Sequence, residues 1–401
     1  MTKIYSESMG RMRRPGSMLV LAAVFVCPAS AGSSLEPPSP TQPPSGKEQR
    51  PVPLVDRHAR GAKTPAWYGQ AEARRLAESV LLWQRANGGW PKNLDVAKAL
   101  SPEERRSVVA GRELTDTTID NGATYEEVRY LAQVGATTGE SHYAAAALRG
   151  IDFLLAAQYP SGGWPQYFPL RPDYSRHITY NDGAMIGAMR LLRDAASGEA
   201  AFAFVDEERR RAAGEAVERG VRAILTTQVR VDGRRTVWCA QHDETTFEPR
   251  PARSFEPVSL SGAESVGIVD FLMDVEQPSP TVVEAVEAAV AWFRAARLPG
   301  RRVERVRAPG APDGVDVVVR EDPGAPALWA RFYEIGTNRA IFAGRDGVVR
   351  YSLAEIEPER RVHYAWYGTW PKELLDGRYP AWTKRRAGKP PGEPAEEERR
   401  P

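Results

Sequence analysis

The chain has 401 residues, of which 42% are hydrophobic, so its length and composition allow one large domain with an ordinary core. Its 54 basic and 52 acidic residues leave a formal net charge of +2, which gives no reason to expect nucleic acid as a partner. Two cysteines are too few for a disulfide framework or a cysteine-rich zinc cluster.

The first 31 residues have the order of a secretory signal peptide. Four basic residues precede a short apolar run at 18–26, and Ala29-Ser30-Ala31 follows it. That run is shorter than the roughly 20 residues that cross a bilayer, and the residues before Cys27 are not those of a lipoprotein cleavage site. We therefore expect a secreted or periplasmic protein with no membrane association after cleavage. Loss of four basic residues and one acidic residue would change the net charge from +2 to −1.

Pro-, Ser- and Gly-rich segments flank the central part of the chain. Residues 32–66 have the composition of a disordered linker, and residues 383–401 have that of a disordered tail. All ten tryptophans lie between them. The sequence therefore predicts one catalytic domain at residues 67–382.

A sequence pattern occurs three times in this domain. Gly-Trp turns at 84–91, 158–165 and, more loosely, 228–238 each follow a stretch with helical apolar spacing, and their tryptophans, Trp90, Trp164 and Trp238, are 74 residues apart. Another helix is expected to start after each turn, at 120–123, 181–184 and 261–264. Such helix pairs must pack side by side to bury their apolar faces. We predict a mainly α fold, an α/α toroid of paired helices, with the three tryptophans in its core.

A small antiparallel β region is expected near residues 315–351. Val-rich and aromatic segments at 317–319, 329–335, 339–342 and 348–351 are separated there by Gly, Pro and Asp-Gly signals. Residues 301–325 are expected to form a variable loop. Sheet content should otherwise be small.

Several common catalytic signatures are absent from the sequence. The five histidines are scattered and no His-Glu-x-x-His occurs, so a catalytic zinc site is not expected. There is also no Gly-x-Ser-x-Gly elbow and no Gly-rich phosphate loop. His177 is compatible with either a cleft or a loop hydrogen bond. The remaining candidates are oxygen-bearing side chains at helix starts and arginines in turns.

Asp120-Asn121 and Asn181-Asp182 occupy matching places in the repeat, each before a Gly-Ala helix start. Carboxylate and amide oxygens from neighbouring units can form a site for a hard cation such as calcium. The alternative is that these residues are ordinary helix N-caps.

Arginines gather in segments rich in Gly, Phe and Tyr, and a guanidinium group binds a carboxylate through two parallel hydrogen bonds. The sequence therefore suggests a binding site for an acidic polymer. The alternative is surface ion pairs with the nearby Glu256, Glu334 and Asp346. The arginines are Arg253, Arg331, Arg339 and Arg345.

Five separated motifs resemble the pectate lyases of polysaccharide lyase family 10, in order along residues 67–382. The motifs lie at residues 88–93 (Gly-Gly-Trp-Pro-Lys-Asn), 118–124 (Thr-Ile-Asp-Asn-Gly-Ala-Thr), 180–185 (Tyr-Asn-Asp-Gly-Ala-Met), 255–262 (Phe-Glu-Pro through Ser-Gly) and 331–347 (Arg-Phe-Tyr-Glu through Gly-Arg-Asp-Gly). The resemblance excludes the linker and the tail, and the segment 301–325 departs from it.

The resemblance implies an α/α toroid that cleaves polygalacturonate by β-elimination with calcium (Ca²⁺) at the cleavage site. It implies that Asp120, Asn121 and Asp182 bind the calcium and that Arg345 is the base. Arg253, Arg331 and Arg339 would hold the uronate carboxylates. We expect polygalacturonate (pectate) to be the binding partner and the protein to be a monomer.

Two other functions remain open from the residues. Gln84-x-x-x-Gly88-x-Trp90 and its copy at 158–164 match the Gln-Trp repeat of triterpene cyclases, which also form α toroids, although no Asp-x-Asp-Asp motif is present. A non-catalytic uronate-binding protein would keep the same fold and site.

Overall fold

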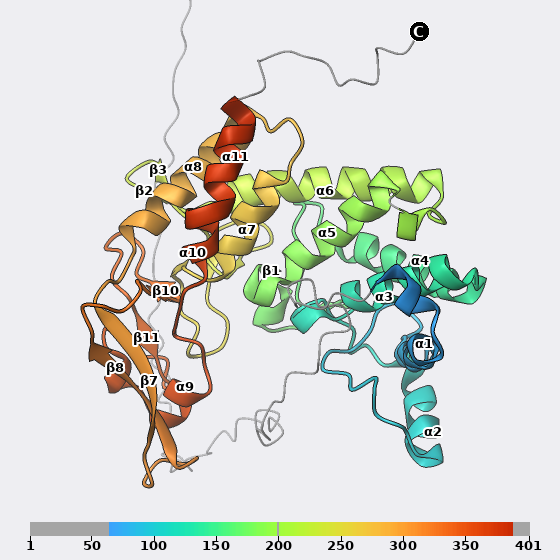
Figure 1. Cartoon of the computed structure of the whole chain (residues 1–401), viewed down its shortest axis with the longest axis horizontal. Coiled ribbons are helices and arrows are strands. Elements are labelled where there is room, and N and C mark those ends of the chain that lie inside the picture. The colour runs from blue at the N-terminus through green and yellow to red at the C-terminus, as the bar shows by residue number, and fades with distance from the viewer. Residues whose placement is uncertain (1–63, 199, 388–401) are drawn as a thin grey trace, which may run out of the picture. The chain divides into compact units, whose positions relative to one another are not determined.

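Helices account for about half of the chain that the structure, a computed structural model, describes at residues 64–198 and 200–387 (Figure 1). The predicted signal peptide, nearly all of the predicted linker and the end of the predicted tail lie outside these residues. No helix in the described part is long and apolar enough to span a membrane.

The helices occur mainly as packed pairs, with α3 against α4, α5 against α6 and α7 against α8. This arrangement confirms the mainly α fold of paired helices. The helices are α1 (Ala71–Trp83), α2 (Pro102–Ala110), α3 (Tyr125–Thr138), α4 (Ser141–Ala157), α5 (Ala184–Ser197), α6 (Glu207–Thr227), α7 (Glu264–Met273), α8 (Pro280–Ala295), α9 (Pro358–Val362), α10 (Pro371–Glu373) and α11 (Tyr379–Ala387).

The repeat glutamines join each turn to the next unit. The carboxamide of each one donates one hydrogen bond to its own turn and another to a backbone carbonyl of α4, α6 or α8. The three sets, all at 2.8–2.9 Å, are Gln84 to Gly88 and Ala146, Gln158 to Gly162 and Ala216, and Gln228 to Thr236 and Ala285. The looser third copy seen in the sequence is therefore a true structural repeat.

The repeat tryptophans are core residues, as predicted. Trp90, Trp164 and Trp238 are 0% exposed, and each indole N–H donates to a carbonyl of the helix before its turn, at 2.7 to 2.8 Å. Trp329 repeats this contact with the carbonyl of Phe293 in α8, at 2.8 Å. The structure therefore contains a fourth unit, which the sequence pattern did not reveal.

The turns need glycine because they touch the next helix. Gly88 and Gly162 have φ values of 92° and 95°. A Cβ on either residue would lie 2.2 or 2.3 Å from a backbone oxygen, that of Arg149 or Arg219. Only glycine allows both the left-handed backbone and the close approach.

The strands are short and all their pairings are antiparallel. The predicted β region is confirmed by β8 (Val315–Glu321), β9 (Trp329–Ala330), β10 (Phe332–Tyr333), β11 (Phe342–Ala343) and β12 (Val349–Arg350). The other strands are β1 (Ile178–Thr179), β2 (Arg230–Val231), β3 (Arg234–Arg235), β4 (Gln241–His242), β5 (Pro249–Arg250), β6 (Leu260–Ser261), β7 (Arg301–Arg307) and β13 (Tyr367–Gly368).

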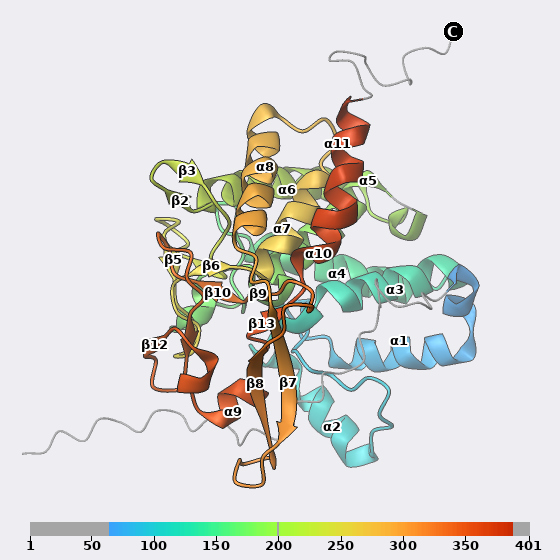
Figure 2. The same cartoon turned by 60° about the vertical axis from the view of Figure 1, so that its left-hand side comes forward.

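The expectation of a variable loop at residues 301–325 is wrong. β7 and β8 form the longest hairpin of the described chain, with Val303 opposite Val319 (Figure 2). The strand β8 also contacts α9. The two valines of β7, Val303 and Val306, are three residues apart among charged residues, so the segment lacks the period-two alternation that indicates a strand.

Candidate active site

Two equivalent turns, η3 (Asp120–Gly122) and η5 (Asn181–Gly183), lie against each other. The first residue of each turn is buried, and the second is exposed with a left-handed backbone, at φ 53° for Asn121 and 50° for Asp182. Asn and Asp tolerate this conformation better than other side-chain-bearing residues. The turns therefore present an amide and a carboxylate from two neighbouring repeat units.

The alternative that these residues are helix N-caps does not hold in the structure. The N-cap residue of α3 is Thr124 and that of α5 is Gly183, and no side-chain cap hydrogen bond is present at either helix. The oxygens of the two turns are thus left for other partners.

Asp120 differs from Asn121 because its carboxylate points into the protein. Lys92 Nζ donates to Asp120 Oδ2 at 2.7 Å. Burial favours the neutral amine, but Asp120 outweighs this effect and raises the pKa of Lys92. The second oxygen, Oδ1, is buried and has no hydrogen-bond partner among the described residues.

Arg331 lies beside η5 and is only 6% exposed. Its Nη2 forms a short ion pair with Glu264 and lies 3.3 Å from both Asn181 Oδ1 and Asp182 Oδ1. Burial is the largest influence and opposes the charge of Arg331, but Glu264, Tyr364, Asp182 and Glu256 together outweigh burial and raise the pKa of the guanidinium group. Arg331 is therefore a fixed cation at the wall of the site.

Arg253 forms a second cationic wall. Its Nε and Nη2 donate to the two oxygens of the buried Glu256 at 2.9 and 2.6 Å. Tyr364 Oη donates to the same carboxylate at 2.7 Å, and its ring lies 4.7 Å below the guanidinium carbon of Arg331. Burial is the largest influence and opposes the charge of Arg253, but the hydrogen bonds and charge of Glu256, together with Tyr364 and Tyr174, outweigh burial and raise the pKa of Arg253.

Tyr174 connects the two sides of the site electrostatically. Burial raises the pKa of its hydroxyl, and charges on Arg253, Glu256, Lys92 and Asp120 act on it as well. The Arg253–Glu256 pair and the Lys92–Asp120 pair therefore lie within electrostatic range of one hydroxyl group. Together, these side chains outline the candidate site.

Arg345 lies at the exposed rim. Its side chain is about half exposed and donates two hydrogen bonds, at 3.0 and 3.1 Å, to Glu359 of α9. Glu359 raises the pKa of Arg345, whereas the like charge of Arg253 lowers it. Asp346, the partner expected from the sequence, pairs instead with Arg350.

Arg339 lies apart from these residues. Its guanidinium carbon stacks 3.5 Å from the centre of the Tyr351 ring, and Tyr351 in turn donates to Glu334. No contact described for residues 64–198 and 200–387 joins Arg339 to Arg253, Arg331 or Arg345.

The oxygen donors of η3 and η5 suit a calcium ion. The donor set contains carboxylate and amide oxygens, which hard cations prefer, and the unpartnered Asp120 Oδ1 is an acceptor without a donor. The residues that would hold the ion are Asp120, Asn121 and Asp182. Lys92 and Arg331 already contact two of these carboxylates, so a cation would compete with them.

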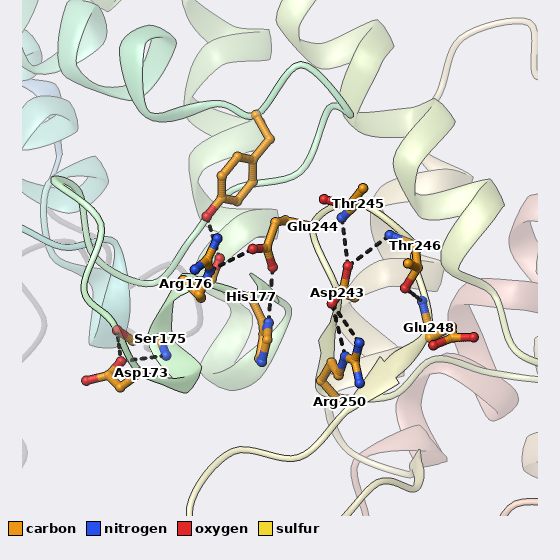
Figure 3. Close-up of polar contacts among 11 residues, drawn as sticks. Asp173, Ser175, Arg176, His177, Asp243, Glu244, Thr245, Thr246, Glu248 and Arg250 are labelled. Atoms are coloured by element: carbon orange, nitrogen blue, oxygen red, sulfur yellow. Dashed lines mark hydrogen bonds and ion pairs between the residues drawn. The ribbon is translucent and has the colours of Figure 1, made fainter. Parts of the chain in front are cut away.

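A second group of possible metal ligands lies at His177, Asp243 and Glu244, whose ligand atoms are within 4.8 Å of one another. Figure 3 shows that donors already occupy this group. Glu244 accepts from Arg176 at 2.7 Å and contacts His177 Nδ1 at 3.1 Å. Asp243 accepts from Arg250 and from two backbone N–H groups, which lower the pKa of Asp243. These hydrogen bonds indicate that the cluster, which includes His177, holds the loops together.

Comparisons of the chain with a family model and with solved structures indicate the same class of protein. The chain matches the family model described as pectic acid lyase over residues 84–375. A family 10 polysaccharide lyase from Cellvibrio cellulosa is 34% identical, with a TM-score of 0.67 over 79% of this chain and 96% of that chain. A mutant of a family 10 polysaccharide lyase from Cellvibrio cellulosa, in complex with trigalacturonic acid, has the same identity and a TM-score of 0.68 over 81% and 97%. None of the curated proteins compared with the chain matches it.

The fold, the charged site and these neighbours together define a polysaccharide lyase. The length of the match to the family model and the sequence identity to the solved structures also identify the family. It belongs to the pectic acid lyase family.

Proposed function

We propose that the chain is a secreted pectate lyase that cleaves α-1,4-polygalacturonate by calcium-assisted anti β-elimination, giving 4,5-unsaturated oligogalacturonides. The observation that carries the proposal is the cluster in which Arg253 and Arg331 line a site with the paired turns η3 and η5. Guanidinium groups bind carboxylates, and polygalacturonate has one on every sugar. The trigalacturonic acid bound by the related lyase supports this substrate class.

The residues suit the electron flow of an elimination. When a base takes the C5 proton, the C–H electrons form the C4–C5 double bond and the C4–O4 bond breaks, so that O4 leaves with its electron pair and takes up a proton. Negative charge builds on the adjacent C6 carboxylate during this step, and Arg331 can stabilise it without reorganisation because Glu264 fixes it. Calcium, when bound, supplies further positive charge to that carboxylate.

Two arginines are candidates for the base. The resemblance points to Arg345. The geometry favours Arg253, because Arg253 and Arg331 both lie over the ring of Tyr364, whereas Arg345 is held at the rim by Glu359. The two candidate side chains are similarly exposed, at 41% for Arg253 and 51% for Arg345. Burial of Arg253 favours its neutral form, although Glu256 and the neighbouring tyrosines leave the pKa of the guanidinium group raised. Substrate binding that weakens the Glu256 contact would further favour neutral Arg253.

One assay separates this proposal from a non-catalytic uronate-binding protein. The purified enzyme is incubated with polygalacturonate, and the ultraviolet absorbance of the unsaturated product is followed with calcium, after exhaustive chelation, and after calcium is restored. We expect activity to disappear and return while far-ultraviolet circular dichroism stays constant. Binding of oligogalacturonate without product under any condition would leave only the binding function. The membership in the pectic acid lyase family gives no support to a triterpene cyclase.

Export is part of the proposal and has its own test. The order of charged, apolar and small residues in the first 31 positions supports cleavage after Ala31. Sequencing the amino terminus of the protein recovered from the medium and the periplasm should find Gly32 first. Recovery of the uncleaved chain from the cytoplasm alone would refute export.

A further inference from the structure

A carboxylate of the third repeat unit, that of Glu264, shares Arg331 with the candidate cation ligand Asp182 of the second unit. In each unit a backbone N–H after the turn donates to the carbonyl of the repeat tryptophan: Thr118 to Trp90 at 3.0 Å, Thr179 to Trp164 at 3.1 Å and Ser261 to Trp238 at 2.8 Å. Three residues after these donors come Asn121, Asp182 and Glu264. Asn121 and Asp182 have left-handed backbones, whereas Glu264 is the first residue of α7.

Glu264 is held on both of its oxygens. Oε1 accepts the short ion pair from Arg331, and Oε2 accepts a short hydrogen bond from Ser261 Oγ. Ser261 Oγ also accepts from the backbone N–H of Glu264 at 3.0 Å. The residue is only 8% exposed, so its carboxylate has one fixed orientation.

The position of Arg331 depends on which carboxylate holds it. Its Nη2 has two hydrogens but faces three acceptors, and Glu264 is nearer than Asn181 or Asp182. A buried cation requires a counter-ion. Without the charge of Glu264, the nearest carboxylate is that of Asp182, at 3.3 Å. Arg331 would then have this carboxylate, which is proposed to bind calcium and which it now shares with Glu264, as its main counter-ion.

We propose that Glu264 is a positioning residue that holds the charge of Arg331 and thereby keeps the Asp182 carboxylate available to a cation. The inference rests on the proposed function, because it concerns the cation site of the same enzyme. In this view Glu264, a residue of the third repeat unit, prevents an Arg331–Asp182 ion pair from blocking the cation site.

The test measures cation binding directly, in metal-free buffer without substrate, by calcium titration calorimetry and by terbium luminescence. Glu264→Gln should lower the affinity for both ions on the order of 10- to 100-fold, the effect of one charged hydrogen bond. The double variant Glu264→Gln/Arg331→Gln removes the competing cation as well and should return the affinity to within about threefold of wild type.

The matched control is Asp194→Asn, which breaks the buried ion pair with Arg129. Asp194 lies ten residues after the start of α5, about 15 Å along that helix from η5. Loss of the Asp194–Arg129 ion pair should leave the cation affinity unchanged. This control therefore separates a general effect of breaking any buried ion pair from the specific effect of breaking the Glu264–Arg331 pair. Thermal unfolding verifies that each variant folds. If Glu264→Gln does not fold, Ser261→Ala, which frees Oε2 and keeps the charge, should still lower the affinity several-fold.

Three results overturn the inference: no cation binding by the wild type, unchanged affinity in Glu264→Gln, or equally weak binding in the single and double variants. The last result would make Glu264 itself a cation ligand. The proposed function fails separately, if the wild type forms no unsaturated product from polygalacturonate. A wild type that binds calcium and cleaves, beside a Glu264→Gln variant with wild-type affinity, refutes the role of Glu264 alone.

Discussion

Replacing Arg253 by lysine should reduce turnover more than any other single arginine-to-lysine change in the site. Lysine keeps the positive charge but cannot donate both hydrogen bonds, at 2.9 and 2.6 Å, that fix Arg253 on Glu256. A positioned base typically contributes 10²–10⁴-fold to the rate. The activation free energy should therefore rise by about 3–5 kcal/mol, while KM changes less because the charge remains.

The matched variant is Arg345→Lys. Its ion pair with Glu359 joins side chains that are 51% and 27% exposed, and such a surface pair contributes about 0–1 kcal/mol. We expect its saturated rate to stay within roughly fivefold of wild type.

The assay is the initial rate of unsaturated product formation from one purified oligogalacturonide at saturating concentration and fixed calcium. A large loss of turnover in Arg345→Lys beside near-wild-type turnover in Arg253→Lys would refute the geometric argument. The role of base would then return to Arg345, as the sequence resemblance has it.

Other properties of the structure give further predictions. Arg331→Ala should weaken oligogalacturonide binding in calorimetry by about 1.5–3 kcal/mol, whereas Arg339→Ala, which removes only the stacking on Tyr351, should leave binding nearly unchanged; equal effects would refute this division. Burial raises the pKa of Glu127 from 4.5 to about 8. As the pH rises, the unfolded chain therefore loses this proton at a lower pH than the folded chain. The free energy of unfolding should fall between these two pH values, by up to about 1.4 kcal/mol per pH unit. Glu127→Gln should flatten that slope in urea titrations, and an unchanged slope would contradict the assignment. Burial lowers the pKa of His242 to about 4, so stability should be lost as the pH falls from 6.5 towards 4, and a variant without this imidazole should lose less.

The repeat was predictable because its constraints are local. Glycine at positions 88 and 162 is required by backbone contact, and tryptophan at 90, 164 and 238 fills the core while donating to a helix carbonyl. These requirements leave a fixed sequence signature at a fixed spacing. The fourth unit, at Trp329, was missed because the β7–β8 hairpin separates its tryptophan from α8 and breaks the spacing of 74 residues.

The ion-pair partners were less predictable, because nearness along the chain is a poor guide to nearness in space. The alternative considered from the sequence was an ion pair of Arg331 with the nearby Glu334, but Arg331 pairs with Glu264, 67 residues away. Arg345 pairs with Glu359 of α9 rather than with the adjacent Asp346. Only Arg253 has the partner that the sequence offered, Glu256. The residue types were evident from the sequence, whereas the charges that tune them depend on the packing of distant segments.

The difference between Asp120 and Asn121 shows most clearly why the site needed the structure. Both are oxygen-bearing residues of one turn, and sequence gives no reason to prefer either as a ligand. The left-handed backbone at Asn121, repeated at Asp182, exposes the second residue of each turn, while the first one faces inward to Lys92 or Arg331. The same turn position thus carries an exposed amide in the first unit and, in the second, an exposed carboxylate that lies 3.3 Å from Arg331. The residue types can be seen in the sequence, whereas the backbone conformation decides which of them face outward.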